Sequence, residues 1–133
     1  MSDVAAVLSA NRAFYRAFAA RDLAAMAAIW ATDAPVACVH PGWDALRDRE
    51  AIMASWRSIL SNPGSPAILC ENEVAHVLGD VAYVLCHEVI EDAYLVATNL
   101  FVRERGQWKL VHHQAGPLAN PPEQPDRPPP RLQ

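Results

Sequence analysis

Two side chains that can move protons near neutral pH stand out in this sequence. Glu88 lies in the apolar run Val84-Leu-Cys-His-Glu-Val-Ile90, where burial would desolvate its carboxyl group, raise its pKa and make it a candidate general acid or base. His40 follows a short apolar run and precedes a Pro-Gly turn, and histidine is the side chain most readily tuned to physiological pH. We therefore predict Glu88 and His40 as catalytic residues. The alternatives are a solvated, outward-facing Glu88 and a His40 that bonds a backbone carbonyl and orients the loop.

Asn99 is a third polar residue in apolar surroundings. It stands in the run Thr98-Asn-Leu-Phe101, and a buried amide there must find hydrogen-bond partners. If the strand that contains Glu88 pairs with this one so that Glu88 faces Ala97, Asn99 lies diagonally beside Glu88 on the same face. We therefore predict that Asn99 binds a ligand, or that it bonds Glu88 or a histidine.

His112 and His113 are adjacent in a predicted strand, so their side chains point to opposite faces. A two-residue turn at Arg105-Gly106 would place His112 opposite Asn99. A three-residue loop, with Gly106 in a bulge, would bring His113 to the face of Asn99. Because Arg-Gly is a poor two-residue turn, we predict the longer loop and His113 as the third catalytic residue. His112 remains a ligand-binding candidate.

The aromatic residues suggest the walls of a ligand cavity. Trp30, Trp43, Trp56 and Phe101 are the candidates. Trp30 and Trp56 also fit ordinary core packing. Trp43 follows a Pro-Gly turn, which favours a position at the rim of the cavity or against the ligand.

Neither a metal site nor a cofactor is predicted. The chain has no His-x-x-x-His or Cys-x-x-Cys spacing, and two histidines on opposite faces of a strand cannot share one ion. The three cysteines are Cys38, Cys70 and Cys86. Their odd number and long spacing indicate reduced thiols that pack as small apolar residues, as is typical of a cytoplasmic protein.

Helices precede strands along the chain. Apolar spacing predicts a helix over residues 3–20, a second helix capped by Asp22 and a third capped by Asp48, with a short strand at 35–40 between the last two. Residues 66–78, 81–91, 94–104 and 107–116 alternate with turn residues and predict an antiparallel meander. Segregated helices and strands indicate an α+β fold.

Composition limits the possible partners. The chain has 133 residues, of which 52% are hydrophobic, so its apolar surface requires a large core, a ligand cavity or a subunit interface. The net charge is −4 and the basic residues are scattered, which argues against nucleic acid. The sequence predicts neither a signal peptide nor a membrane span. We expect one domain over 1–116 and a tail over 117–133, with seven prolines, that is disordered or lies along the surface.

Three segments together resemble the snoaL-like branch of the nuclear transport factor 2-like superfamily, which has the ketosteroid-isomerase-like fold. They are Phe14 to Trp30; Val39-His-Pro-Gly-Trp43 with Arg49-Glu-Ala-Ile-Met-Ala-Ser-Trp56; and Thr98-Asn-Leu-Phe101 with Gly106-Gln-Trp-Lys-Leu-Val-His-His113. The resemblance covers residues 10–116 and implies a cone-shaped curved antiparallel sheet packed on three N-terminal helices. It also implies an apolar interior and a homodimer formed through the outer face of the sheet.

The same resemblance leaves the activity open. Asp48 replaces the glycine that is common before the third helix, and His40 stands where ketosteroid isomerases have a carboxylate base, so the steroid-isomerase mechanism is not supported. The superfamily contains isomerases, cyclases and dehydratases as well as non-catalytic association domains. We therefore carry two hypotheses. One is a cofactor-free enzyme or binding protein for a small hydrophobic carbonyl compound, and the other is an association domain whose polar residues form a closed internal network.

Overall fold

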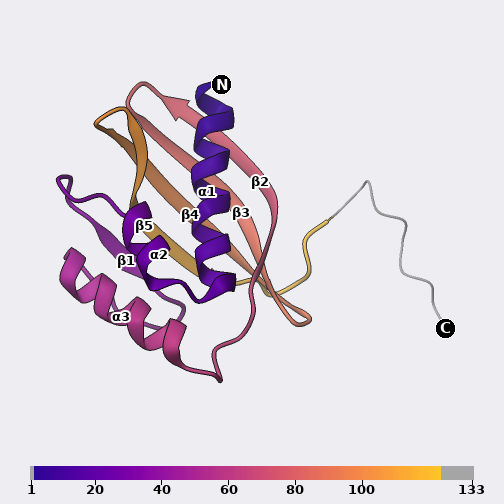
Figure 1. The fold of residues 1–133 in the computed structure, drawn as a ribbon. Coiled ribbons are helices and arrows are strands. Elements are labelled where there is room, and N and C mark those ends of the chain that lie inside the picture. The colour runs from indigo at the N-terminus through magenta and orange to yellow at the C-terminus, as the bar shows by residue number, and fades with distance from the viewer. Residues whose placement is uncertain (1, 124–133) are drawn as a thin grey trace.

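The computed structural model of this protein describes residues 2–123, which fold into three helices and a five-stranded sheet (Figure 1). In chain order the elements are α1 (Asp3–Ala20), α2 (Leu23–Ile29), β1 (Ala37–Val39), α3 (Arg49–Ser61), β2 (Leu69–Leu78), β3 (Val81–Ile90), β4 (Ala93–Glu104) and β5 (Gln107–Pro117). The predicted α+β fold, with a curved sheet against three helices, is confirmed.

Each helix begins at a side-chain cap. Ser2, Asp22 and Asp48 have extended backbones, and each accepts a hydrogen bond from the backbone N–H three residues further on. These bonds satisfy N–H groups that have no partner within the first helical turn. The two caps predicted from the sequence, Asp22 and Asp48, are confirmed, and the replacement of glycine at 48 leaves the turn compatible with a helix start.

The cap at α3 gives a first testable prediction. Replacing Asp48 with Ala removes the bond from its carboxylate to Ala51 N, which is 2.8 Å long. We expect a loss of about 1 kcal/mol in the free energy of unfolding, measured by urea denaturation. Asp48→Asn keeps an oxygen acceptor and should stay within a few tenths of a kcal/mol of the parent. Equal losses in both variants would show that the cap is not what stabilises this helix start.

The sheet order is β1-β5-β4-β3-β2, with β1 parallel to β5 and all other neighbours antiparallel. The β2–β5 segment is therefore the predicted meander, although β2 begins at Leu69 rather than at residue 66. Beyond β5, residues 118–123 form neither helix nor strand. The tail was predicted to begin at residue 117, which is the last residue of β5, and its residues 124–133 lie outside the described residues.

The predicted pairing of β3 with β4 was wrong by two residues. Glu91 and Asp92 alone connect the strands, so that Ile90 pairs with Ala93 and Glu88 faces Leu95 instead of Ala97. A shift of two residues preserves which face each side chain occupies, because strand side chains alternate with a period of two. Glu88 and Asn99 consequently still lie on the same face of the sheet.

The predicted loop between β4 and β5 was also wrong, although it led to the right histidine. Arg105 and Gly106 form a two-residue turn in which both residues have positive φ, 51° and 77°. Positive φ at both central residues matches the twist of a hairpin, and glycine adopts it without strain. The extra residue lies further along β5, where the register shifts between Leu100 and Phe101, and this bulge turns His113 to the face of Asn99.

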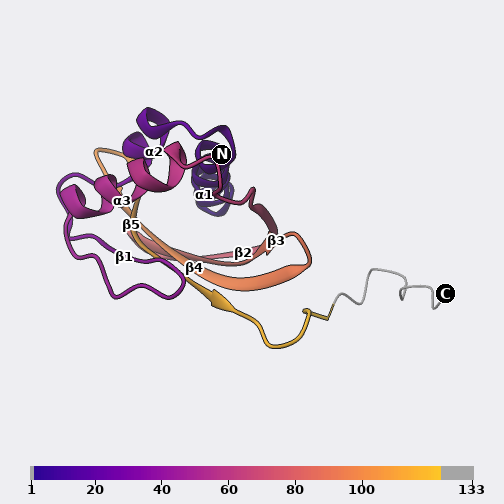
Figure 2. The same cartoon turned by 90° about the horizontal axis from the view of Figure 1, so that it is seen from below.

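The sheet and the helices form two layers (Figure 2). All three helices lie on the concave, inner face of the sheet, and no helix covers the convex, outer face in the described part of the chain. The interior between the layers holds the large buried side chains, among them Phe14, Met26, Ile52, Trp56 and Phe101. None of the helices found in the described residues is long and apolar enough to cross a membrane.

Candidate functional site

The hydroxyl group of Tyr15 is the centre of a buried polar cluster. Tyr15 lies on the sheet-facing side of α1 and donates a hydrogen bond of 2.7 Å to Oε2 of Glu88 on β3. The hydroxyl oxygen of Tyr15 also accepts a 3.2 Å hydrogen bond from Nδ2 of Asn99 on β4, and it lies 3.3 Å from Sγ of Cys86. Glu88 is 3% exposed and Asn99 is fully buried, so the three elements meet around polar groups inside the core.

Asn99 determines which ring nitrogen of His113 carries the proton. Its Nδ2 donates to Oδ1 of Asn11 at 2.8 Å, and its Oδ1 lies 2.6 Å from Nδ1 of His113. Because an amide oxygen only accepts hydrogen bonds, Nδ1 of His113 must carry the proton in this contact. The lone pair of His113 is therefore on Nε2, which can accept a hydrogen bond.

The free nitrogen of His113 faces the buried carboxyl group. Nε2 of His113 lies 3.8 Å from Oε2 of Glu88, just beyond hydrogen-bond length. Burial, together with the charges of His40 and His112, lowers the pKa of His113 to about 3. Burial raises the pKa of Glu88, and the hydrogen bond from Tyr15 opposes that rise. The surroundings therefore favour a neutral imidazole beside a carboxyl group that holds its proton more tightly than usual.

His40 occupies the other end of the same interior. It follows β1 and its Nε2 lies 2.9 Å from Oγ of Ser55 on α3, which donates its own proton to Ile52 O. Ser55 Oγ must then accept from His40, so Nε2 carries the proton and Nδ1 has the lone pair. Burial lowers the pKa of His40 to about 4. In place of the alternative bond to a backbone carbonyl, Nε2 of His40 bonds the hydroxyl group of Ser55 within the described residues.

Three of the four predicted aromatic residues adjoin the cluster or its core. The ring of His40 lies 4.9 Å from Trp43 and 4.9 Å from Trp56, and its ring is 6.4 Å from that of His113. Trp43 is 48% exposed, as expected for the rim, whereas Trp56 and Phe101 are fully buried. Of these three aromatic residues, Trp43 is the one that is exposed.

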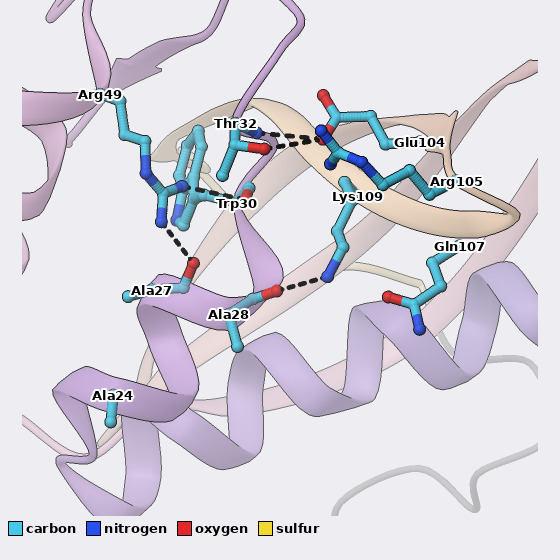
Figure 3. Close-up of a pocket in the computed structure, with 10 residues that line it drawn as sticks. All are labelled: Ala24, Ala27, Ala28, Trp30, Thr32, Arg49, Glu104, Arg105, Gln107 and Lys109. Atoms are coloured by element: carbon cyan, nitrogen blue, oxygen red, sulfur yellow. Dashed lines mark hydrogen bonds between the residues drawn. The ribbon is translucent and has the colours of Figure 1, made fainter.

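Trp30 and His112 lie elsewhere. Trp30 ends α2 and lines a groove of about 490 Å³ between α2 and the β4–β5 hairpin, where Arg49 and Lys109 bond the last carbonyl groups of the helix (Figure 3). His112 pairs with Leu100 on the outer face, opposite to His113. Neither residue joins the buried cluster. Both were predicted to bind the ligand because the sequence alone does not show which way their side chains point.

Four members of the site are not among the predicted site residues: Asn11, Tyr15, Ser55 and Cys86. A signal was available for two of them. Asn11 and Tyr15 are spaced by four on α1, and therefore stand one above the other on its buried face. A polar pair on an otherwise apolar helical stripe indicates that the facing sheet supplies partners. Ser55 had no comparable signal, since serine is common on the polar side of helices.

A surface groove lies beside the cluster. It runs between α1 and β2, has a volume of about 400 Å³, and is lined by both Tyr15 and Cys70. An ion pair of 3.1 Å between Arg12 and Glu73 bridges the two elements at this groove. Among the described residues, no group of histidine, cysteine and acidic side chains has an arrangement that could hold a metal ion.

Comparison with known proteins identifies this architecture. The profile of the SnoaL-like domain family matches residues 7–120. A Streptomyces avermitilis structure, called a candidate dehydratase of the nuclear transport factor 2-like family, is 33% identical with a TM-score of 0.82, over 89% of this chain and 97% of that one. A Thiobacillus denitrificans structure is called a candidate calcium/calmodulin-dependent protein kinase type II association domain. It is 33% identical with a TM-score of 0.74, over 84% of this chain and 94% of that one.

A curated relative is longer than this chain. The F-box protein SKIP8 of Arabidopsis thaliana is 24% identical over 112 residues, which are 83% of this chain. The match spans about half of that protein, 48% of its length.

Proposed function

This chain belongs to the SnoaL-like domain family, and we propose that its buried cluster performs cofactor-free acid–base chemistry on a small hydrophobic carbonyl compound. The reaction class is isomerisation, dehydration or cyclisation. The observation that carries the proposal is the approach of the unprotonated nitrogen of His113, Nε2, to within 3.8 Å of the buried carboxyl group of Glu88. A few convergent polar groups in an apolar interior are typical of small-molecule sites.

The geometry supports distinct roles for the cluster residues. His113 has its lone pair on Nε2 and, with its pKa lowered to about 3, would accept a hydrogen bond and relay a proton rather than hold one. Glu88, with its raised pKa, would donate a proton to the developing product or take one up. Asn99 would hold the tautomer of His113 through the 2.6 Å bond. The neutral His40 would serve as a second proton carrier at the Trp43 side of the interior.

Two further features support binding of a small molecule. The groove of about 400 Å³ between α1 and β2 falls within the size range of ligand sites, and it reaches Tyr15, the group that links Glu88 to Asn99. The related Streptomyces avermitilis protein is itself called a candidate dehydratase. Three free thiols within the described residues suit a reducing compartment, and we propose the cytoplasm.

Replacing Glu88 tests the proposal. Small carbonyl compounds would first be screened for ligands by thermal shift, and those that bind would then be tested for turnover. We expect Glu88→Gln, which keeps the size but not the titratable proton, to reduce kcat by at least about 100-fold. Glu50→Gln, on the exposed first turn of α3, is the matched control and should leave kcat unchanged. Unchanged turnover in Glu88→Gln would rule out the acid–base role.

A second candidate function is association with another copy of this chain. The observation that favours it is the outer face of the sheet, where apolar side chains remain exposed: Val74 51%, Leu78 65%, Val81 40%, Leu85 42% and Val96 41%. Exposed apolar patches of this kind mark interaction sites. The related Thiobacillus denitrificans protein is called an association domain. Both functions are compatible in one molecule, because the cluster and the outer face lie on opposite sides of the sheet.

A further inference from the structure

The outer face of the sheet has a central row that crosses four strands. His76 on β2 pairs with Tyr83 on β3, Tyr83 with Leu100 on β4, and Leu100 with His112 on β5. The rings of His76 and Tyr83 stack at 5.0 Å. Apolar pairs flank this row, among them Leu78 with Val81 and Val74 with Leu85. Two histidines therefore lie inside the exposed apolar patch.

Other charged groups lie at the margins of this face, as far as residues 2–123 show. Glu71 faces His87, whose Nδ1 lies 2.9 Å from Nδ2 of Asn72. Lys109 faces Val102, and its Nζ bonds Ala28 O on α2.

The remaining groups near the patch are similarly placed. Arg47 lies beyond the edge strand β1, next to Leu46, which forms a bridge with Cys38 of that strand. The outward-facing residues of β1 are the apolar Ala37 and Val39. Tyr83 lies in the row itself, and the ring of Tyr94 lies 6.4 Å from that of His87 at the margin. No carboxylate among the described residues lies in the central row or in the apolar pairs beside it.

A surface with this composition fits a second copy of itself. A twofold interface places the same patch on both subunits, so a charge near the axis would face an identical charge and be repelled by it. This patch has no fixed charge, although the whole chain carries −4, and it is therefore suited to self-association at pH values where its histidines are neutral.

We propose that the outer face is a pH-gated interface, which holds two copies together only while His76 and His112 are neutral. This inference rests on the association proposed above and specifies its regulation. Protonation would bring four positive charges into an apolar interface of two copies, with no carboxylate in the row to pair with them. Burying unpaired charge is strongly unfavourable, so the copies separate instead.

The direction of the effect follows from linkage. Each proton that the separated copies bind and the dimer excludes shifts the equilibrium toward the monomer as the pH falls. If the interface excludes the charged form of all four histidines, dissociation is linked to the uptake of up to four protons, and the dissociation constant rises as the pH falls. The association therefore weakens as the pH falls and is fully restored as the pH rises.

Sedimentation velocity over a range of concentrations, at pH 8 and pH 6, measures this directly. We expect a dimer at pH 8 whose dissociation constant rises at least about 10-fold at pH 6, while circular dichroism shows an unchanged fold. The double variant His76→Gln, His112→Gln should dimerise equally at both pH values. His87→Gln is the matched control, because that histidine lies beside Glu71 at the margin, and it should keep the full pH response.

The outcomes separate the two proposals. A monomer at pH 8 at 100 µM would overturn the association itself. A dimer with the same dissociation constant at both pH values would overturn the gate and leave the association standing. Loss of the pH response in His87→Gln, with the double variant still responsive, would also overturn the inference, because it would place the sensor at the margin.

Discussion

Lowering the pH from 7 to 5 is expected to reduce the free energy of unfolding by about 3 kcal/mol, because the folded protein holds two histidines neutral that the unfolded chain protonates. Burial lowers the pKa of His113 to about 3, with the charges of His40 and His112 adding to the effect, and it lowers the pKa of His40 to about 4. In the unfolded chain both would titrate near 6.5.

The sign of the effect follows from these pKa values. Each depressed histidine contributes stability that is present above about pH 6.5 and is lost as the pH falls toward its folded value. Between pH 7 and 5 this amounts to about 2 kcal/mol for each histidine. Glu88 acts in the opposite direction, since its raised pKa stabilises the fold at low pH and this stabilisation is lost as the pH rises through the folded value. It therefore offsets part of the loss.

Urea denaturation at pH 7, 6 and 5 measures this dependence. The experiment is best done in the His76→Gln, His112→Gln background, which removes any contribution from the outer face. His113→Gln added to that background should lower stability at pH 7 but flatten the pH dependence by roughly half. Stability that stays constant from pH 7 to 5 would contradict the assignment of two buried neutral histidines.

Replacing Asn99 with Leu is expected to have the largest effect of any single substitution in the cluster. It removes the acceptor of His113 Nδ1 and the donor to Asn11 Oδ1, and it removes the donor to Tyr15. Buried polar groups left without partners each cost about 1–3 kcal/mol, so we expect a loss of about 3–5 kcal/mol in the free energy of unfolding. Chemical denaturation at pH 7 gives the value directly.

Matched variants show whether the network is responsible. Thr98→Ala, on the neighbouring residue that faces outward, should change stability by less than about 1 kcal/mol. In Asn99→Leu, His113→Leu both partners of the 2.6 Å bond are absent, so the loss should be smaller than the sum of the two single losses. Strictly additive losses would show that the two side chains are not coupled.

Local sequence determined the secondary structure and the burial of the main site residues. Asp22 and Asp48 cap their helices because a carboxylate next to a free helix N-terminus finds its partners within three residues. Glu88 and Asn99 face the interior because they alternate correctly with the apolar residues of their strands. These features depend on neighbours along the chain and need no knowledge of the rest of the fold.

Tertiary structure alone decided which of these residues meet. The choice between His112 and His113 depended on a bulge in β5, and a shift of one residue reverses every face of a strand. Trp30 and Trp56 both lie on the apolar side of a predicted helix. Trp30 nevertheless lines a separate groove, because the end of α2 packs beside the β4–β5 hairpin. Tyr15 joins Glu88 across 73 residues of chain because α1 packs on the concave sheet. The sequence by itself therefore determined the fold class and the inward-facing polar residues, whereas register and helix packing, which depend on contacts between distant segments, decided how they form one site.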